Sequence, residues 1–154
     1  MAYTDEVWIR ARNQFSNTTL MKAWLDSFER PKKGANAYTR DALKVRDDFV
    51  LATSISDTLA PNARNFREIA VLEKQANAIP IDEIKSPALG AINERIRILD
   101  GEAEVLANQF KNAETVNQRE TAESKLRELS PQSLGGIKSG EKRRAASAFR
   151  SVLG

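Results

Sequence analysis

An apolar repeat in the second half of the chain constrains the fold more than any other feature. Its members are separated by three or four residues over several turns: Leu89, Ile92, Ile96, Leu99, Ala103, Leu106, Phe110 and Ala113. This spacing places all of them on one face of an α-helix. A seam of this kind is typical of a long helix packed against partner helices. Gly101 falls opposite the seam, where it costs about 1 kcal/mol relative to alanine without ending the helix.

The ends of this helix can be predicted from the flanking residues. Ser86-Pro87 favours a helix start. Serine can cap a helix, and a backbone N–H in the first turn has no helical partner, so proline loses no hydrogen bond there. The seam fails at Asn117 and Glu120 and resumes out of phase at Ala122. A break or reversal is therefore expected near residues 112–118.

The rest of the chain supplies further helical patterns. We expect a first helix over residues 5–30 with a break at Asn17, a second over 36–52, and a last one that ends at Ser130-Pro131. Residues 66–79 fit a short helix or an extended segment equally well. Four substantial helices with short connections favour an all-α bundle. The 154 residues fit a single domain, in which 131–154 is predicted to be a flexible, basic C-terminal segment.

The composition excludes several kinds of chemistry. The chain has no histidine and no cysteine, so it lacks the usual general base, thiol nucleophile and zinc ligands. It has no glycine-rich phosphate loop and no metal-ligand cluster. We therefore expect a protein that is not an enzyme, with no cofactor, metal or small-molecule substrate. No apolar run approaches the roughly 20 residues of a membrane span, and we expect no membrane partner.

Positive charge is concentrated near the C-terminus. The whole chain carries a net charge of +3, whereas residues 138–150 contain five cations against one glutamate, a net +4. The remainder is close to neutral. The whole-chain case for a polyanion partner is weak, and the basic tail needs its own explanation.

Arg95 and Arg97 follow the start of the seam and pose a question of geometry. On a continuous helix, residues two apart point in nearly opposite directions and cannot bind one ligand. Where a helix passes into extended chain, the same spacing places both side chains on one side. A shared ligand therefore requires the helix to stop near Glu94, and the continuous seam favours an unbroken helix instead.

The stretch IDEIKSPALGAINERIRI at 81–98 combines Asp82, the trio Leu89-Gly90-Ala91 and the ending Arg95-x-Arg97-Ile98. In this combination it resembles the coat proteins of rod-shaped plant viruses of the tobacco mosaic virus type, the tobamoviruses and their virgavirus relatives. The opening MAYT is similar to theirs, as are the second-helix arginines and the close RAASAF followed by SVL.

The resemblance implies an antiparallel four-helix bundle with a small β-sheet, stacked helically around single-stranded RNA. The protein would then be found in the virion and in the host cell cytoplasm. Arg95 and Arg97 would contact RNA phosphates, beside Asn93, which replaces an aspartate of the family. Arg40, Arg46 and Arg119 would be secondary contacts. Phosphate contacts suit a coat that must cover any sequence of its genome.

The family also places carboxylates against one another across subunit contacts. Such pairs hold while protonated and repel as the pH rises. Asp82 matches one such position, and Asp100, Glu102 and Glu114 approximate others. The chain departs from the family where Val50 and Leu51 follow Phe49 without an acid, which puts one of these pairs in doubt. Ile92 in place of a phenylalanine and the very regular seam after it are further departures.

Two other functions stay open on the sequence alone. A helical scaffolding, phage structural or coiled-coil protein would use the seam at 89–113 to oligomerise without RNA. A small nucleic-acid-binding module would use the basic tail 138–150, although no helix-turn-helix spacing supports it.

Overall fold

The computed structural model describes residues 37–154 and shows this part of the chain to be all-α. Its helices are α3 (Ala37–Ser54), α4 (Phe66–Asn77), α5 (Asp82–Lys111), α6 (Val116–Glu128) and α7 (Arg143–Leu153). A π-helical turn, η1 (Ile55–Leu59), extends α3, and a 3-10 segment, η2 (Pro131–Gly136), follows α6. Residues 37–154 contain no β-strand, so the expected small sheet is absent from them. The helix predicted over 5–30 lies outside the described residues.

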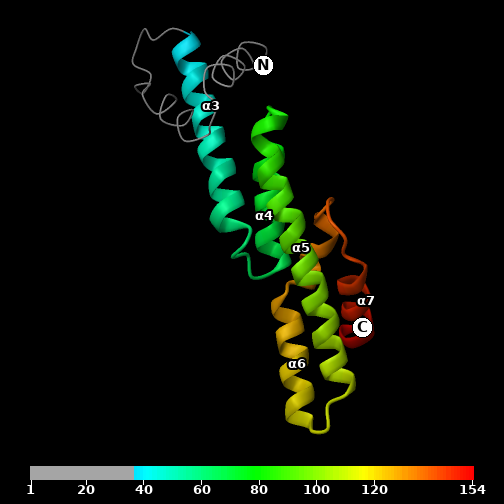
Figure 1. The fold of residues 1–154 in the computed structure, drawn as a ribbon. Coiled ribbons are helices and arrows are strands. Elements are labelled where there is room, and N and C mark those ends of the chain that lie inside the picture. The colour runs from blue at the N-terminus through cyan, green and yellow to red at the C-terminus, as the bar shows by residue number, and fades with distance from the viewer. Residues whose placement is uncertain (1–36) are drawn as a thin grey trace.

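The long helix α5 is the centre of this arrangement. Figure 1 shows α3 and α4 beside its N-terminal half, and α6 and α7 on either side of its C-terminal half. The predicted seam forms its buried face, with Ile92, Ile96, Leu99 and Ala103 fully buried. An aromatic contact in the core joins α4 to α7, since Phe66 packs edge-on against Phe149 with ring centroids 6.1 Å apart.

The start of α5 differs from the prediction. The helix begins at Asp82, so Pro87 lies inside it and Ser86 is not a cap. Instead the Ser86 hydroxyl donates to the Asp82 carbonyl at 2.7 Å. The missing N–H of Pro87 removes one helical hydrogen bond. Burial of Ile84 and Ala88, on either side of Pro87, holds the helix together across this position.

The reversal expected near 112–118 is confirmed. α5 ends at Lys111 and α6 begins at Val116, after a Thr115 cap. The Gln118 N–H donates to the Thr115 hydroxyl, and the Thr115 N–H donates to the Gln118 side chain. This reciprocal capping box satisfies two otherwise unpaired donors and starts the returning helix.

The ambiguous segment 66–79 forms a helix. The side chain of Asn65 accepts a hydrogen bond from the Glu68 N–H at 3.0 Å and thereby caps the first turn of α4. Once the turn is capped, Phe66, Ile69, Leu72 and Ala76 share one buried face, which an extended strand could not provide.

The C-terminal segment 131–154, for which the sequence predicts flexibility, contains η2 and the helix α7 in the structure. α7 buries Ala145, Ala148 and Phe149 against α5 and its neighbours. Gly140 adopts a positive φ of 79°, and a Cβ at this position would lie 2.8 Å from the Ile96 side chain. Glycine therefore lets the chain turn closely over α5 at this position.

Glu73 fixes the loop that precedes α7. This carboxylate is only 5% exposed and accepts hydrogen bonds from the Lys138 N–H at 2.9 Å and the Ser139 N–H at 3.1 Å. It also accepts from the Ser139 hydroxyl. Burial raises the pKa of Glu73, but these hydrogen bonds and the nearby Lys142 charge outweigh it and hold the pKa below its usual value.

We expect Glu73→Gln to lower the free energy of unfolding by about 1–3 kcal/mol near pH 7, because an amide accepts fewer hydrogen bonds than a carboxylate and carries no charge. The folded-state pKa lies below the unfolded value of about 4.3. The contribution of Glu73 is therefore complete above the unfolded pKa and is lost as the pH falls through the folded pKa. Urea unfolding at several pH values measures both effects, and exposed Glu128→Gln is the control. Equal acid sensitivity in wild type and Glu73→Gln would contradict this role.

Candidate nucleic-acid interface

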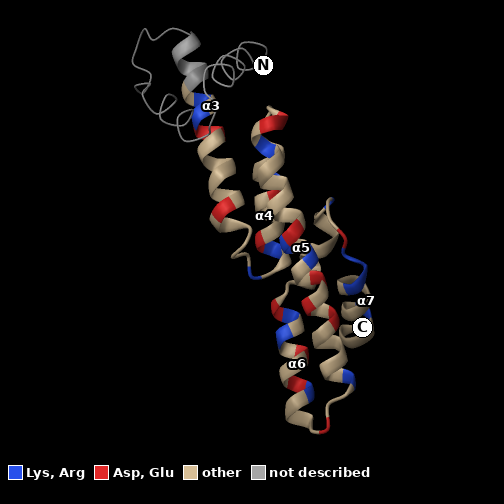
Figure 2. Cartoon of the chain, in the orientation of Figure 1, with Lys and Arg blue, Asp and Glu red and all other residues tan. Residues whose placement is uncertain are grey.

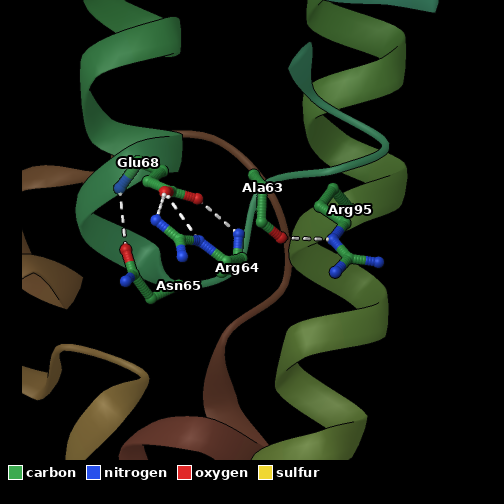
Figure 3. A network of polar contacts seen from close by, with 5 residues as sticks. All are labelled: Ala63, Arg64, Asn65, Glu68 and Arg95. Carbon is green, nitrogen blue, oxygen red and sulfur yellow. Dashed lines mark hydrogen bonds and ion pairs between the residues drawn. The ribbon is translucent and has the colours of Figure 1, made fainter. Parts of the chain in front are cut away.

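Arg95 is partly buried and makes a contact within the chain. Its Nε donates to the Ala63 carbonyl at 2.7 Å, which joins α5 to the turn that precedes α4. Figure 3 shows this bond and, next to it, the contacts of Arg64 with Glu68 that close the same turn. The two terminal nitrogens of Arg95 point away from Ala63 in this view. Arg95 thus supports the fold through Nε and presents its outer nitrogens away from the turn.

Arg97 is exposed and pairs with Glu94 along the same helix. Its Nη2 lies 2.6 Å from one carboxylate oxygen of Glu94, and its Nε lies 3.0 Å from the other. The hydrogen bonds from Arg97 lower the pKa of the Glu94 carboxyl. Pairs of this kind on a helix surface contribute little to stability and exchange readily with other ligands.

The two arginines do not converge. α5 runs without interruption from Asp82 to Lys111, so the helix end near Glu94 that a shared ligand requires does not occur. Residues two apart on a helix are rotated by about 200° from each other. Arg95 therefore lies on the side of α5 that packs against the Ala63 turn, and Arg97 lies on the solvent side. A single phosphate cannot be bound by both from one subunit.

The arginines predicted as secondary RNA contacts lie on two helices, α3 and α6. Arg46 of α3 lies 2.9 Å from the carboxylate of Asp47. Arg119 of α6 stacks on Phe110, with its guanidinium carbon 5.8 Å from the ring centroid. Phe110 is fifteen residues beyond Arg95 on α5, a distance of about 22 Å along the helix. Asn93 is exposed, and the side chain of Arg40 lies outside the described part of α3.

Three of the four predicted inter-subunit carboxylates are accessible. Asp82, Glu102 and Glu114 are exposed, and Asp82 also pairs with Lys85 at 3.4 Å. These side chains can meet a neighbouring subunit, and their role there stays a prediction.

Asp100, the fourth predicted inter-subunit carboxylate, differs from the other three because its side chain is bonded within the chain. Its side chain is completely buried and accepts hydrogen bonds from the Ala145 N–H at 2.7 Å and from Arg144 Nε at 3.1 Å. α7 has no side-chain cap of its own, so Asp100 caps it from α5. A negative charge at this end of α7 also complements the helix dipole. Asp100 therefore links α5 to the first turn of α7 within the chain.

Asp48 of α3 is a largely buried carboxyl with a raised pKa that was not among the predicted site residues. Burial raises its pKa, Lys44 opposes this, and the neighbouring Asp47 raises it again. The net pKa is above the usual value. The Asp47-Asp48 pair was visible in the sequence, but its burial in α3 was not.

The cations of the basic tail contribute to a groove between α5 and α7. Figure 2 shows basic residues at the start of α7 and at the end of α5. The groove is lined from α5 by Glu104, Ala107, Asn108 and Lys111, and from α7 by Arg143, Arg144, Ser147, Ala148 and Ser151. Its lining thus combines three cations with one carboxylate and three uncharged polar side chains.

Six large apolar side chains of the described residues are exposed, and four of them form two pairs, while Val50 and Val116 are exposed singly. Ile98 and Val105 lie on the outer face of α5, 41% and 54% exposed. Leu59 and Val71, 42% and 53% exposed, line a mostly apolar groove between η1 and α4.

Comparisons of the chain with protein-family models, with curated proteins and with solved structures found no match. Within residues 37–154 no group of three or more metal-ligating side chains could hold an ion. None of the helices that the structure describes is both long and apolar enough to cross a membrane.

We expect Asp100→Ala to lower the free energy of unfolding by about 2–3 kcal/mol, because it leaves the buried Ala145 N–H without a partner and releases Arg144. Glu102→Ala, an exposed position on the same helix, is the matched control and should change stability by less than about 0.5 kcal/mol. Urea unfolding of dilute protein makes the comparison. An inter-subunit role for Asp100 would instead leave the stability of the dilute protein unchanged.

Proposed function

We propose that this protein is a structural, non-enzymatic coat subunit that assembles helically around single-stranded RNA. Residues 1–154 would complete an antiparallel four-helix bundle of the tobacco mosaic virus coat type, in a virion formed in the host cell cytoplasm. Its partners would be RNA and many copies of itself, with no membrane and no small-molecule substrate. The observation that carries the proposal is the pair of exposed apolar surfaces on different elements of one subunit.

These surfaces differ from scattered surface residues because their members are aligned. Ile98 and Val105 are seven residues apart, so they lie about two turns apart on the same side of α5. Leu59 and Val71 line one groove. Single exposed aliphatic residues are ordinary, whereas grouped ones mark contact sites. Contact between two different surfaces of neighbouring copies is heterologous, and repetition of such a contact builds rings or helices.

The RNA contact is supported by the resemblance of residues 81–98 to coat proteins and by the accessible arginines of the described helices. Because Arg95 and Arg97 point apart on α5, they contact different phosphates in this proposal. Helical stacking brings Arg95 of one copy and Arg97 of another along the same strand. Contacts to phosphates alone do not depend on base sequence, which a coat requires.

The carboxylates suggest how assembly depends on pH. Asp82, Glu102 and Glu114 are exposed and able to face carboxylates of a neighbouring subunit. Like charges held close raise the pKa of one partner, so the contact is favourable while one group is protonated and unfavourable when both ionise. Assemblies are therefore expected to weaken as the pH rises above neutrality.

A second candidate is a helical assembly or scaffolding protein that oligomerises without RNA. The observation that favours it is the unbroken α5, on which Arg95 and Arg97 are both engaged within the chain. In this alternative the same apolar surfaces drive assembly and the arginines serve the fold and solubility.

We expect the double variant Ile98→Asp, Val105→Asp to prevent assembly while the fold stays intact. Burying one such aliphatic side chain contributes about 1.5–3 kcal/mol, so the association constant should fall at least tenfold. Sedimentation velocity measures the assembly and circular dichroism the fold. Lys125→Asp, an exposed position on α6, is the control. Assembly of the double variant at wild-type concentrations would show that these residues lie outside the contact.

Nuclease protection separates the two candidates. A coat subunit mixed with single-stranded RNA at mildly acidic pH should protect long RNA from ribonuclease and sediment faster than protein alone. Replacement of Arg95 and Arg97 by alanine should reduce protection while protein-only oligomers persist. Identical oligomers with and without RNA, and no protection, would favour the scaffolding protein and overturn the coat proposal.

A further inference from the structure

The basic segment 138–150 has no part in the RNA and subunit contacts proposed above, yet hydrogen bonds within the chain fix its position. Glu73 fixes the loop before α7, and Asp100 fixes the first turn of α7. Arg143 and Arg144 are thereby placed along one side of the α5–α7 groove, across from Lys111. We propose that this groove is a second polyanion site, which binds the phosphodiester backbone of single-stranded nucleic acid. This groove proposal rests on the proposed function only in taking the polyanion to be RNA.

The groove presents two facing rows of polar side chains. Ser147 and Ser151 follow Arg143 at intervals of four residues, so these three side chains share one face of α7. Asn108 and Lys111 are three residues apart on α5 and share the opposing face. Hydroxyl, amide and guanidinium groups are the donors that proteins use most often for phosphate oxygens. No aromatic side chain lines the groove, so it suits a backbone and not stacked bases.

The positive charge of the groove favours an anion, and one carboxylate in its lining opposes anion binding. Three cations face one carboxylate, Glu104. Arg144 is braced through Nε by Asp100, which orients its guanidinium without using the terminal nitrogens in that bond. Arg143 pairs through Nε with Glu141, and both side chains are largely exposed, so this pair exchanges readily. The Glu104 carboxylate repels a phosphate, so the variant Glu104→Gln should bind the nucleic acid more tightly.

The test measures binding of a fluorescent uridine oligonucleotide by anisotropy, at protein concentrations where sedimentation shows no assembly. Lys111→Gln combined with Arg143→Gln should weaken binding about tenfold or more at low salt. The slope of log affinity against log salt should fall by about 1.4, since each phosphate contact to a single strand contributes about 0.7. Glu104→Gln should strengthen binding severalfold.

Lys125→Gln combined with Lys138→Gln is the matched control, because it removes the same charge from exposed positions outside the groove. It should weaken binding by less than about threefold, with urea midpoints of all variants near wild type. Equal losses in the groove and control variants would overturn the proposal, since only net charge would then matter. Failure of Glu104→Gln to strengthen binding would also count against it.

Inorganic phosphate distinguishes the sources of the ligand. Titration of isotope-labelled protein should move the amide signals of α7 and the end of α5 at lower concentration with the oligonucleotide than with phosphate. An equal or stronger response to phosphate alone would identify a site for a free anion and overturn the nucleic-acid assignment.

The groove proposal and the coat proposal can fail separately. If a groove variant binds RNA with wild-type affinity and still forms rods that protect RNA, the groove proposal alone is overturned. If RNA binding depends on the groove but no rods form, the coat proposal alone is overturned.

Discussion

The buried face of α5 is the surface on which the rest of the described structure depends. α3, η1 and α4 pack on its N-terminal half, and α6 and α7 pack on its C-terminal half. Ile92, Ile96 and Leu99 are completely buried there, and each such side chain contributes about 1.5–3 kcal/mol. Because one unbroken helix spans both halves, the sites on the two halves are held at a fixed separation along a common axis. This rigidity suits a subunit that must repeat the same contacts in an assembly.

Two buried carboxylates give the C-terminal segment its position. Glu73 of α4 and Asp100 of α5 both accept backbone N–H groups from the segment that leads into and begins α7. Each carboxylate satisfies donors that would otherwise lose water without a partner. The basic residues of this segment are therefore part of a fixed surface, and the α5–α7 groove exists because of these long-range hydrogen bonds.

The sequence predicted the parts of the fold that depend on periodicity. The seam of α5, the helix predicted over 36–52 and observed as α3 (Ala37–Ser54), and the reversal before α6 all follow from local spacing and capping residues. The start of α5 was mispredicted because Ser86-Pro87 resembles a helix start, whereas burial of Ile84 and Ala88 sustains the helix across the proline. The order of 131–154 and the role of Asp100 could not be predicted, since both depend on contacts between residues 44–66 positions apart. For the candidate site, the sequence identified Arg95 and Arg97, and the seam already favoured the continuous helix that separates them. The contact of Arg95 with the Ala63 carbonyl, 32 residues away, could not be predicted from local spacing.

In a helical coat, each subunit presents different surfaces to its neighbouring subunits. It also presents cations to the RNA strand that passes between the subunits. The exposed apolar pairs, the separated arginines of α5 and the α5–α7 groove are consistent with one another in such an arrangement. Electron microscopy of the purified protein, with and without single-stranded RNA at mildly acidic and mildly alkaline pH, tests this most directly. The proposal predicts rods of uniform diameter that become longer with RNA and come apart as the pH rises. Small discrete oligomers under every condition would contradict it.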